Sequence, residues 1–147
     1  MGTEVKTLSG WARLRACVGD GWSMYPACEL MTIEFTGRPV TLPGGYTARM
    51  SADGATIVAT VLDGDNALAS SARLARWGRY GIVDQVETSA RHRRLGLTTA
   101  VMSVLGNWAV GNGTRTGLLS GTEQGVVLYR RLGWTAHGEI AGAVRLR

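Results

Sequence analysis

The sequence has 147 residues, a formal net charge of +5 and 45% hydrophobic residues, which is the balance of a folded globular protein rather than a disordered one. No apolar run approaches the roughly 20 residues of a membrane-spanning helix, and two cysteines are too few for a disulfide scaffold. We therefore expect one domain over residues 1–147 that does not enter a membrane. Because the N-terminus lacks the apolar core of a signal peptide, a cytoplasmic location is the default expectation.

The first half of the chain predicts strands joined by short turns. Residues 1–45 carry the weakest pattern, in which we expect a short helix over Trp11–Val18 and a strand over Glu29–Phe35. From Tyr46 on, apolar alternation and Gly-containing turns become regular. Four strands are predicted there, over Tyr46–Met50, Ala55–Leu62, Ala67–Trp77 and Tyr80–Thr88. Since no helix separates these strands, they should form an antiparallel meander.

The second half predicts alternating helices and strands. Apolar residues at helical spacing indicate a helix from about Gly96 to Val110. A short buried strand follows, and because a helix precedes it we expect it to run parallel to Tyr80–Thr88. Thr122 is a good N-cap for a second helix. The remaining predicted elements are the strand Arg115–Ser120, the helix Thr122–Leu132 and two closing strands, Trp134–Ile140 and Ala143–Arg147.

A basic turn, Arg91–Arg94, lies between the strand Tyr80–Thr88 and the helix that follows. The first N–H groups of a helix have no partner within the helix and attract anions, and neighbouring arginines add charge and bidentate donors. No aromatic residue is interleaved with these arginines to stack on bases. The turn therefore predicts a compact polyphosphate ligand rather than a nucleic acid.

Two motifs in this half resemble those of a known family. Arg93-Arg94-Leu95-Gly96-Leu97-Thr98 resembles the acyl-CoA pyrophosphate loop of the GNAT superfamily of N-acetyltransferases, [QR]-x-x-G-x-[GA]. Downstream, Leu128-Tyr129-Arg130-Arg131-Leu132-Gly133-Trp134 is similar to that family's L-Y-x-x-x-G-[FW] motif. The resemblance covers residues 67–134 best and residues 1–45 poorly. It implies a mixed α/β (α+β) fold, with a mostly antiparallel twisted sheet, a β-α-β-α core and a splayed central strand pair.

The resemblance implies acetyl-CoA as co-substrate and assigns residues to it. The pantetheine arm would pair with the end of the strand at Val86, Glu87 and Thr88. The pyrophosphate would be held by the loop residues Arg93, Arg94, Leu95, Gly96, Leu97, Thr98 and Thr99. The opposite wall would include Ser120, Thr122 and Tyr129. Thr98 stands where the family has Gly or Ala, so its side chain either narrows the approach of phosphate or donates a hydrogen bond to it.

Acetyl transfer to an amine needs a proton donor for the leaving thiolate and a route for the proton that the amine loses. The resemblance makes Tyr129 the donor. Asp84 and Glu87 are both candidates for the base, and strand alternation puts them on opposite faces unless a bulge intervenes. His92 is expected to be a surface or capping residue. No His and Cys cluster has metal-ligand spacing, so no metal is predicted.

The acceptor is the least defined part of the prediction. The activity implied is an N-acetyltransferase acting on an amine of a small molecule or peptide; the alternative is a non-catalytic acyl-CoA-binding or sensor module. A basic nucleic-acid-binding domain is supported by charge alone. The acceptor side is either open, or covered by residues 1–28 or by the second subunit of a homodimer. For Trp77 and Tyr80 we expect core packing.

Overall fold

The computed structural model describes residues 3–146, which form two compact units. One unit comprises Ile33–Leu118, and the other joins the residues up to Thr32 with those from Leu119 onward. Strands β3 and β8 run from one unit into the other. The expected fold class is confirmed: a mixed, mostly antiparallel sheet with three α-helices.

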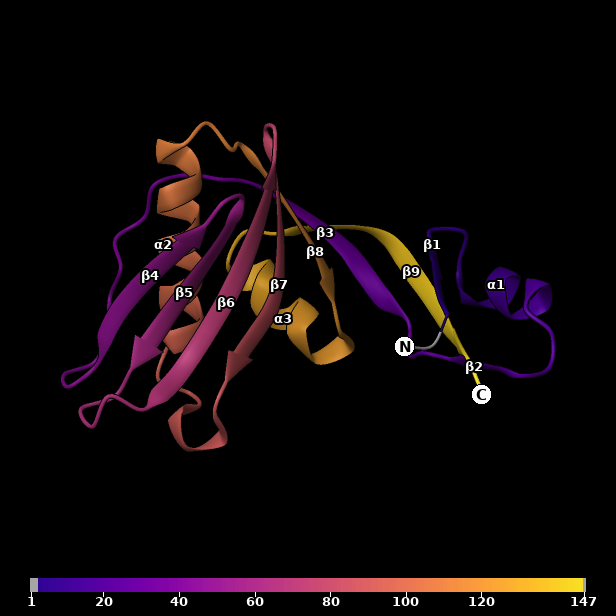
Figure 1. The fold of residues 1–147 in the computed structure, drawn as a ribbon, viewed down its shortest axis with the longest axis horizontal. Helices are drawn as coiled ribbons and strands as arrows, with labels where there is room; N and C mark the ends of the chain where they lie inside the picture. The colour runs from indigo at the N-terminus through magenta and orange to yellow at the C-terminus, as the bar shows by residue number, and fades with distance from the viewer. Residues whose placement is uncertain (1–2, 147) are drawn as a thin grey trace. The chain divides into compact units, whose positions relative to one another are not determined.

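The unit Ile33–Leu118 contains the predicted antiparallel meander (Figure 1). Each of its strands pairs with the next in the chain, and β8 then lies parallel to β7, as predicted from the helix between them. The strands are β4 Thr47–Asp53, β5 Thr56–Leu62, β6 Leu68–Trp77, β7 Tyr80–Thr88 and β8 Thr116–Gly121. The turn expected at Ser51–Gly54 is instead Gly54-Ala55, because Asp53 and Thr56 still pair as strand residues.

Helix α2, Leu97–Gly111, covers one face of this meander, where it contacts β5 and β6 most extensively. Strand alternation explains the contact, since every second residue of β5 is fully buried. The helix contributes its own apolar stripe, formed by Leu97, Ala100, Val101, Leu105 and Ala109. The core of this unit therefore lies between α2 and the sheet. The opposite face of the sheet is not covered by α2.

The second unit is built on one long strand, β9, Thr135–Arg145. This corrects the prediction of two closing strands. No turn forms at Ala141-Gly142, because β9 parts from β3 at Ile140 and continues between two N-terminal strands that supply new hydrogen-bond partners. Those N-terminal elements are β1 Glu4–Thr7, α1 Trp11–Cys17, β2 Trp22–Met24 and β3 Cys28–Glu34. Helix α3, Glu123–Arg131, also contacts β9.

Thr114, just before β8, is fully buried, and its hydroxyl oxygen has no hydrogen-bond partner within residues 3–146. A buried polar group without a partner costs free energy, and valine has the same shape without the hydroxyl. We expect Thr114→Val to raise the free energy of unfolding by about 1 kcal/mol. Urea denaturation followed by circular dichroism measures this change.

Thr116→Val is the matched control, because the Thr116 hydroxyl donates to Glu34 Oε1 at 2.7 Å. That exchange removes a satisfied hydrogen bond and should not stabilise the protein. If Thr114→Val lowers the urea midpoint, the hydroxyl has a partner in solution and the buried-donor argument is wrong.

Candidate functional site

The loop between β7 and α2 has a backbone suited to bind an anion. After a short 3₁₀ turn, Ala90–His92, Arg94 has φ 62° and Gly96 has φ 76°, and the helix begins at Leu97. Left-handed residues next to right-handed ones turn successive N–H groups toward one side. The first N–H groups of α2 add to this set, since Ala100 is the first helical residue whose N–H bonds back along the chain, to Gly96 O at 3.1 Å.

The loop arginines remain available to a ligand. Arg93 and Arg94 are exposed, and within residues 3–146 neither side chain makes an ion pair or hydrogen bond. The positive φ of Arg94 is unfavourable for a residue with a side chain, and such backbone strain is concentrated at binding sites. Two full charges and a set of oriented amides therefore lie together in one short segment.

Thr98, the departure from the family loop, faces the preceding strand. Its hydroxyl lies 2.8 Å from the hydroxyl of Thr88, which lies 2.8 Å from that of buried Ser70. The Ser70 hydroxyl also donates to Glu87 O at 3.0 Å. This chain of hydroxyls ties the first turn of α2 to the end of β7 and to β6, so the side chain of Thr98 helps to hold the loop against the strand.

The central strand pair separates early. β7 and β8 pair only from Tyr80 to Ile82 with Thr116 to Leu118. On its other edge β7 stays paired with β6 as far as Thr88. In the described chain, the β8-facing edge of β7 beyond Ile82 carries no strand pairing. Backbone donors and acceptors of Val83–Thr88 on this edge are therefore unused by the sheet.

A β-bulge in β7 changes which faces its carboxylates occupy. Gln85 has φ 50°, and the register with β6 shifts between Ser71 and Arg73. Asp84 then stands opposite Arg73, and Glu87 stands opposite Ser71. Because Ser71 and Arg73 are two residues apart on one strand, both carboxylates lie on one face, the face away from α2. Plain alternation would have separated them.

The two carboxylates differ in the hydrogen bonds and ion pairs that they make. Asp84 accepts two hydrogen bonds from Arg73, at 2.8 Å from Nε and 2.6 Å from Nη2. This hydrogen bond and the charge of Asp84 raise the pKa of Arg73, so the guanidinium keeps its charge. Glu87 is exposed and, within residues 3–146, its carboxylate has no ion pair or hydrogen bond. Of the two, only Glu87 is free to exchange a proton without breaking an ion pair.

Tyr129 lies on α3, in the other unit. Burial raises the pKa of its phenol, which therefore keeps its proton at neutral pH. The ring tilts against Trp134, with centroids 6.2 Å apart, and lies over Gly121 and Gly125. A Cβ on Gly125 would come within 3.1 Å of the ring, so both glycines leave room for it.

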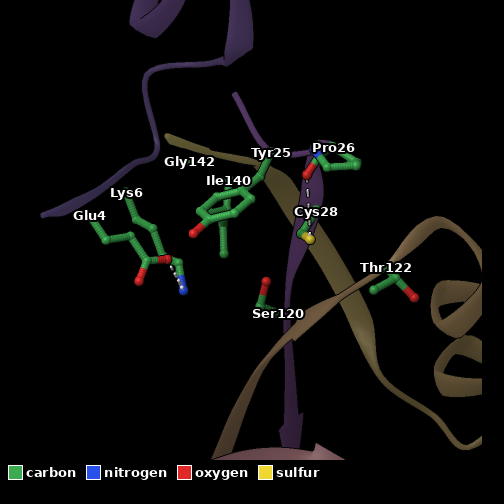
Figure 2. Close-up of a pocket in the computed structure, with 9 residues that line it drawn as sticks. All are labelled: Glu4, Lys6, Tyr25, Pro26, Cys28, Ser120, Thr122, Ile140 and Gly142. Atoms are coloured by element: carbon green, nitrogen blue, oxygen red, sulfur yellow. Dashed lines mark hydrogen bonds and ion pairs between the residues drawn. The ribbon is translucent and has the colours of Figure 1, made fainter. Parts of the chain in front are cut away.

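Thr122 is the N-cap of α3, as predicted, and its hydroxyl accepts from Gly125 N at 3.2 Å. Ser120 is exposed at the end of β8. Both residues line a cavity that the N-terminal strands help to form (Figure 2). The predicted site residues therefore form two groups. The β7 end and its loop belong to one unit; Ser120, Thr122 and Tyr129 belong to the other.

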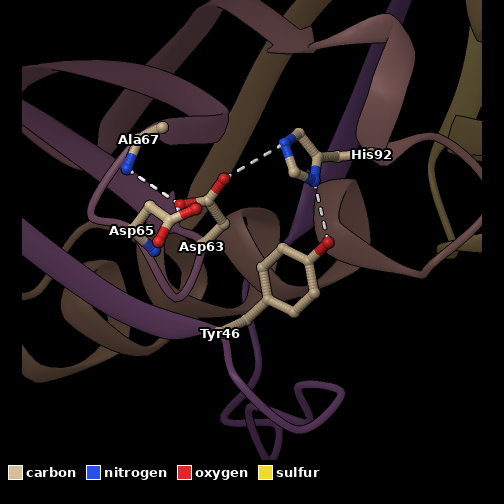
Figure 3. Close-up of polar contacts among 5 residues, drawn as sticks. All are labelled: Tyr46, Asp63, Asp65, Ala67 and His92. Carbon is tan, nitrogen blue, oxygen red and sulfur yellow. Dashed lines mark hydrogen bonds and ion pairs between the residues drawn. The ribbon is translucent and has the colours of Figure 1, made fainter.

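His92 has a role that the sequence did not reveal. Figure 3 shows it between Tyr46 and Asp63. Its Nδ1 lies 2.8 Å from the Tyr46 hydroxyl and its Nε2 lies 3.5 Å from Asp63 Oδ2. Asp63 also accepts from the N–H groups of Ala67 and Asp65, and chiefly these bonds lower its pKa. Through its contact with Asp63, His92 connects the start of the loop to the β5–β6 turn.

The expectation that Trp77 and Tyr80 pack in the core is wrong: their exposed fractions are 79% and 40%. They pair across the β6–β7 turn on the face of the sheet that α2 does not cover. In the described chain, no group of three or more His, Cys, Asp or Glu side chains has an arrangement that could hold a metal ion. No helix within residues 3–146 combines the length and apolar character needed to cross a membrane.

Comparison with known proteins places this geometry in a family of folds. No protein-family model and no curated protein matches the sequence. A GCN5-related N-acetyltransferase from Kribbella flavida superposes with a TM-score of 0.74 at 16% identity, over 98% of this chain and 68% of that one. One from Sphaerobacter thermophilus gives 0.73 at 16% identity, over 98% and 60%. A tandem GNAT protein from the clavulanic acid biosynthesis pathway gives 0.71 at 12%, over 90% and 57%.

In two of these three comparisons the chain spans less than two thirds of the matched structure. Similarity at this level of identity concerns the course of the backbone. It agrees with the parallel β7–β8 pair that separates early and with the loop that leads into α2. The chain has the fold of the GCN5-related N-acetyltransferases, the GNAT superfamily.

Proposed function

We propose that the protein is an N-acetyltransferase that transfers the acetyl group of acetyl-CoA to an amine of a small molecule or peptide. The observation that carries this proposal is the loop at Arg93–Thr99. There, two exposed arginines, which have no side-chain partner among residues 3–146, precede a left-handed glycine and the free N–H groups of a helix. The donor set is that of a pyrophosphate site, and the fold is that of proteins named as N-acetyltransferases.

The residues fit the remaining parts of acetyl-CoA as well. Pantetheine carries amides, which can pair with the unused edge of Val86–Thr88 as an added strand would. Acetyl-CoA supplies an activated thioester. Tyr129, whose phenol stays protonated, donates a proton to the departing sulfur. Glu87, whose carboxylate has no partner in the part of the chain that the structure describes, receives the proton of the amine directly or through water.

The binding part of the proposal is tested by calorimetry with acetyl-CoA and the double variant Arg93→Ala/Arg94→Ala. Each charge-assisted hydrogen bond contributes about 1.5–3 kcal/mol, and solvent screening reduces this at exposed sites. We expect acetyl-CoA to bind the double variant at least about tenfold more weakly than the native protein. The difference should shrink as the salt concentration rises.

Arg91→Ala is the matched control, because Arg91 lies in the preceding 3₁₀ turn and outside the loop motif. Its affinity for acetyl-CoA should stay within about twofold of the native value. Equal affinity in the double variant and the native protein would show that the loop does not hold the pyrophosphate. Failure of the native protein to bind acetyl-CoA at low salt would refute the proposal.

A thiol-release assay over a panel of amines separates the enzyme from a non-catalytic acyl-CoA-binding or sensor module. Both readings require acetyl-CoA to bind, and only the enzyme releases free CoA faster when an amine is added. The Thr98 hydroxyl lies within hydrogen-bond distance of the Thr88 hydroxyl at the end of β7, which supports a loop that can still receive phosphate. The cytoplasmic location and the homodimer stay predictions; fractionation and sedimentation, respectively, test them.

A further inference from the structure

A cavity of about 330 Å³ lies within the unit that contains Tyr129 (Figure 2). This volume is at the small end of the range for ligand sites, which is about 300–1,000 Å³. Its walls are mostly apolar and come largely from the N-terminal segment that the motifs did not explain.

The aromatic wall of this cavity, Tyr25, packs on the backbone of β9. The backbone N–H of Tyr25 donates to Gly142 O at 2.7 Å. The Tyr25 ring lies so close to Gly142 that a Cβ there would come within 2.8 Å of Cδ2. Gly142 therefore leaves the room that the Tyr25 ring occupies in this wall.

One wall of the cavity comes from the segment between β8 and α3, in the same unit as Tyr129. Ser120 and Thr122 line it, and the family resemblance places both residues beside the cofactor. A Cβ on Gly125 would lie 3.2 Å from the Thr122 hydroxyl and 3.1 Å from the Tyr129 ring. Gly125 therefore lies between the ring of Tyr129, the proposed proton donor, and Thr122, which lines the cavity.

On the other side of the cavity lies an ion pair. Glu4 and Lys6 are two residues apart on β1, so both point to the same face, and their charged groups are 3.1 Å apart. In Figure 2 this pair and Thr122 lie on opposite sides of the cavity. Together the pair offers one strong acceptor and one strong donor. Its complement is a neutral group that both donates and accepts, such as a hydroxyl or an amide.

We propose that this cavity is the acceptor site of the acetyl transfer. It binds a small primary amine with a short apolar body, whose amine lies toward Ser120 and Thr122. A hydroxyl or amide at its far end bonds to Glu4 and Lys6. The inference rests on the proposed function for the fate of the amine. It rests on the cavity alone for binding. Its size excludes a folded protein as the group that enters.

Cys28 lines the same cavity and allows binding to be measured without catalysis. In a Cys17→Ser background, Cys28 is the remaining cysteine. We expect 5-amino-1-pentanol and tyramine, added without acetyl-CoA, to slow the alkylation of Cys28 by iodoacetamide about tenfold when present at about ten times their Kd. The hydroxyl-free partners, pentylamine and phenethylamine, should protect at higher concentrations only, and spermidine should not protect.

The Lys6→Met and Glu4→Gln variants test the far end. Each should lower the preference for 5-amino-1-pentanol over pentylamine, in protection and in kcat/KM, because the hydroxyl then faces only one of its two charged partners. The native affinity for acetyl-CoA should be retained. This ratio compares two ligands on one variant, so partial destabilisation does not mimic the result.

The outcomes separate this inference from the proposed function. If amines increase thiol release and no amine protects Cys28, the assignment of the cavity as acceptor site is wrong and the proposed acetyltransferase activity still stands. If amines protect Cys28 and no thiol is released, the cavity binds amines and the proposed acetyltransferase activity is wrong. Protection that is the same for hydroxyl and hydroxyl-free amines would overturn the role of Glu4 and Lys6.

Discussion

Replacing Tyr129 by phenylalanine is expected to lower kcat roughly 100-fold, within the range of about 10²–10⁴ that general acid catalysis contributes. The ring, its contact with Trp134 and its fit over Gly121 and Gly125 all remain, so the change removes only the proton donor. The affinity for acetyl-CoA should stay within about twofold. Thiol release under single-turnover conditions measures the effect on the chemical step.

The pH dependence gives a second readout of the same residue. Burial raises the pKa of Tyr129 above 10.0, the ordinary value for a tyrosine, so the phenol holds its proton throughout the neutral range. If the native protein is the proposed acetyltransferase, it should therefore show no loss of activity from Tyr129 between pH 7 and the raised pKa of this residue. Tyr80→Phe, the same exchange at an exposed tyrosine, should leave kcat unchanged. Equal turnover in Tyr129→Phe and the native protein would remove Tyr129 from the mechanism.

Replacing Glu87 by glutamine is the second large expected effect, a fall in kcat of roughly 100-fold, because the amine loses its proton acceptor. Glutamine keeps the size of the side chain and, since the carboxylate has no partner in the described residues, costs no structural contact. The affinity for acetyl-CoA should be nearly unchanged. Steady-state kinetics with a saturating amine, measured from pH 6 to 9, give kcat directly.

Asp84→Asn is the control for Glu87→Gln, on the same strand and face. It breaks the bidentate pair with Arg73 and should lower the thermal midpoint more than Glu87→Gln does. Its kcat should fall by only a few-fold. If Asp84→Asn abolishes turnover and Glu87→Gln does not, the assignments are reversed and Asp84 is the base despite its ion pair.

The elements around the loop were predictable because their signals are local. Alternation identified Tyr80–Thr88, helical spacing identified the helix that begins at Leu97, and a threonine followed by glutamate identified the N-cap at Thr122. The loop arginines and Tyr129 were found through motifs, which need no knowledge of distant contacts. Their placement on strand end, loop and helix agrees with the structure, and their roles stay predictions.

The features that escaped prediction depend on distant partners. The sequence predicted a break between Ile140 and Ala143, yet β9 continues there because the N-terminal strands pair with it. The bulge at Gln85 contains no glycine that would have indicated it in the sequence. The common face of Asp84 and Glu87 could therefore not be predicted. The contacts of His92 join residues 46, 63 and 92, and no local pattern connects them.

The long strand β9 also governs the order in which the chain can fold during synthesis. Glu4 pairs with Val144, so β1 and β2 find no partner until almost the whole described chain has been made. The contacts within Ile33–Leu118 need only a continuous stretch and are available much earlier. Closing contacts of such long sequence separation is slow. The proposed acceptor cavity, walled by β1 and β9, is therefore the last part of the protein to form.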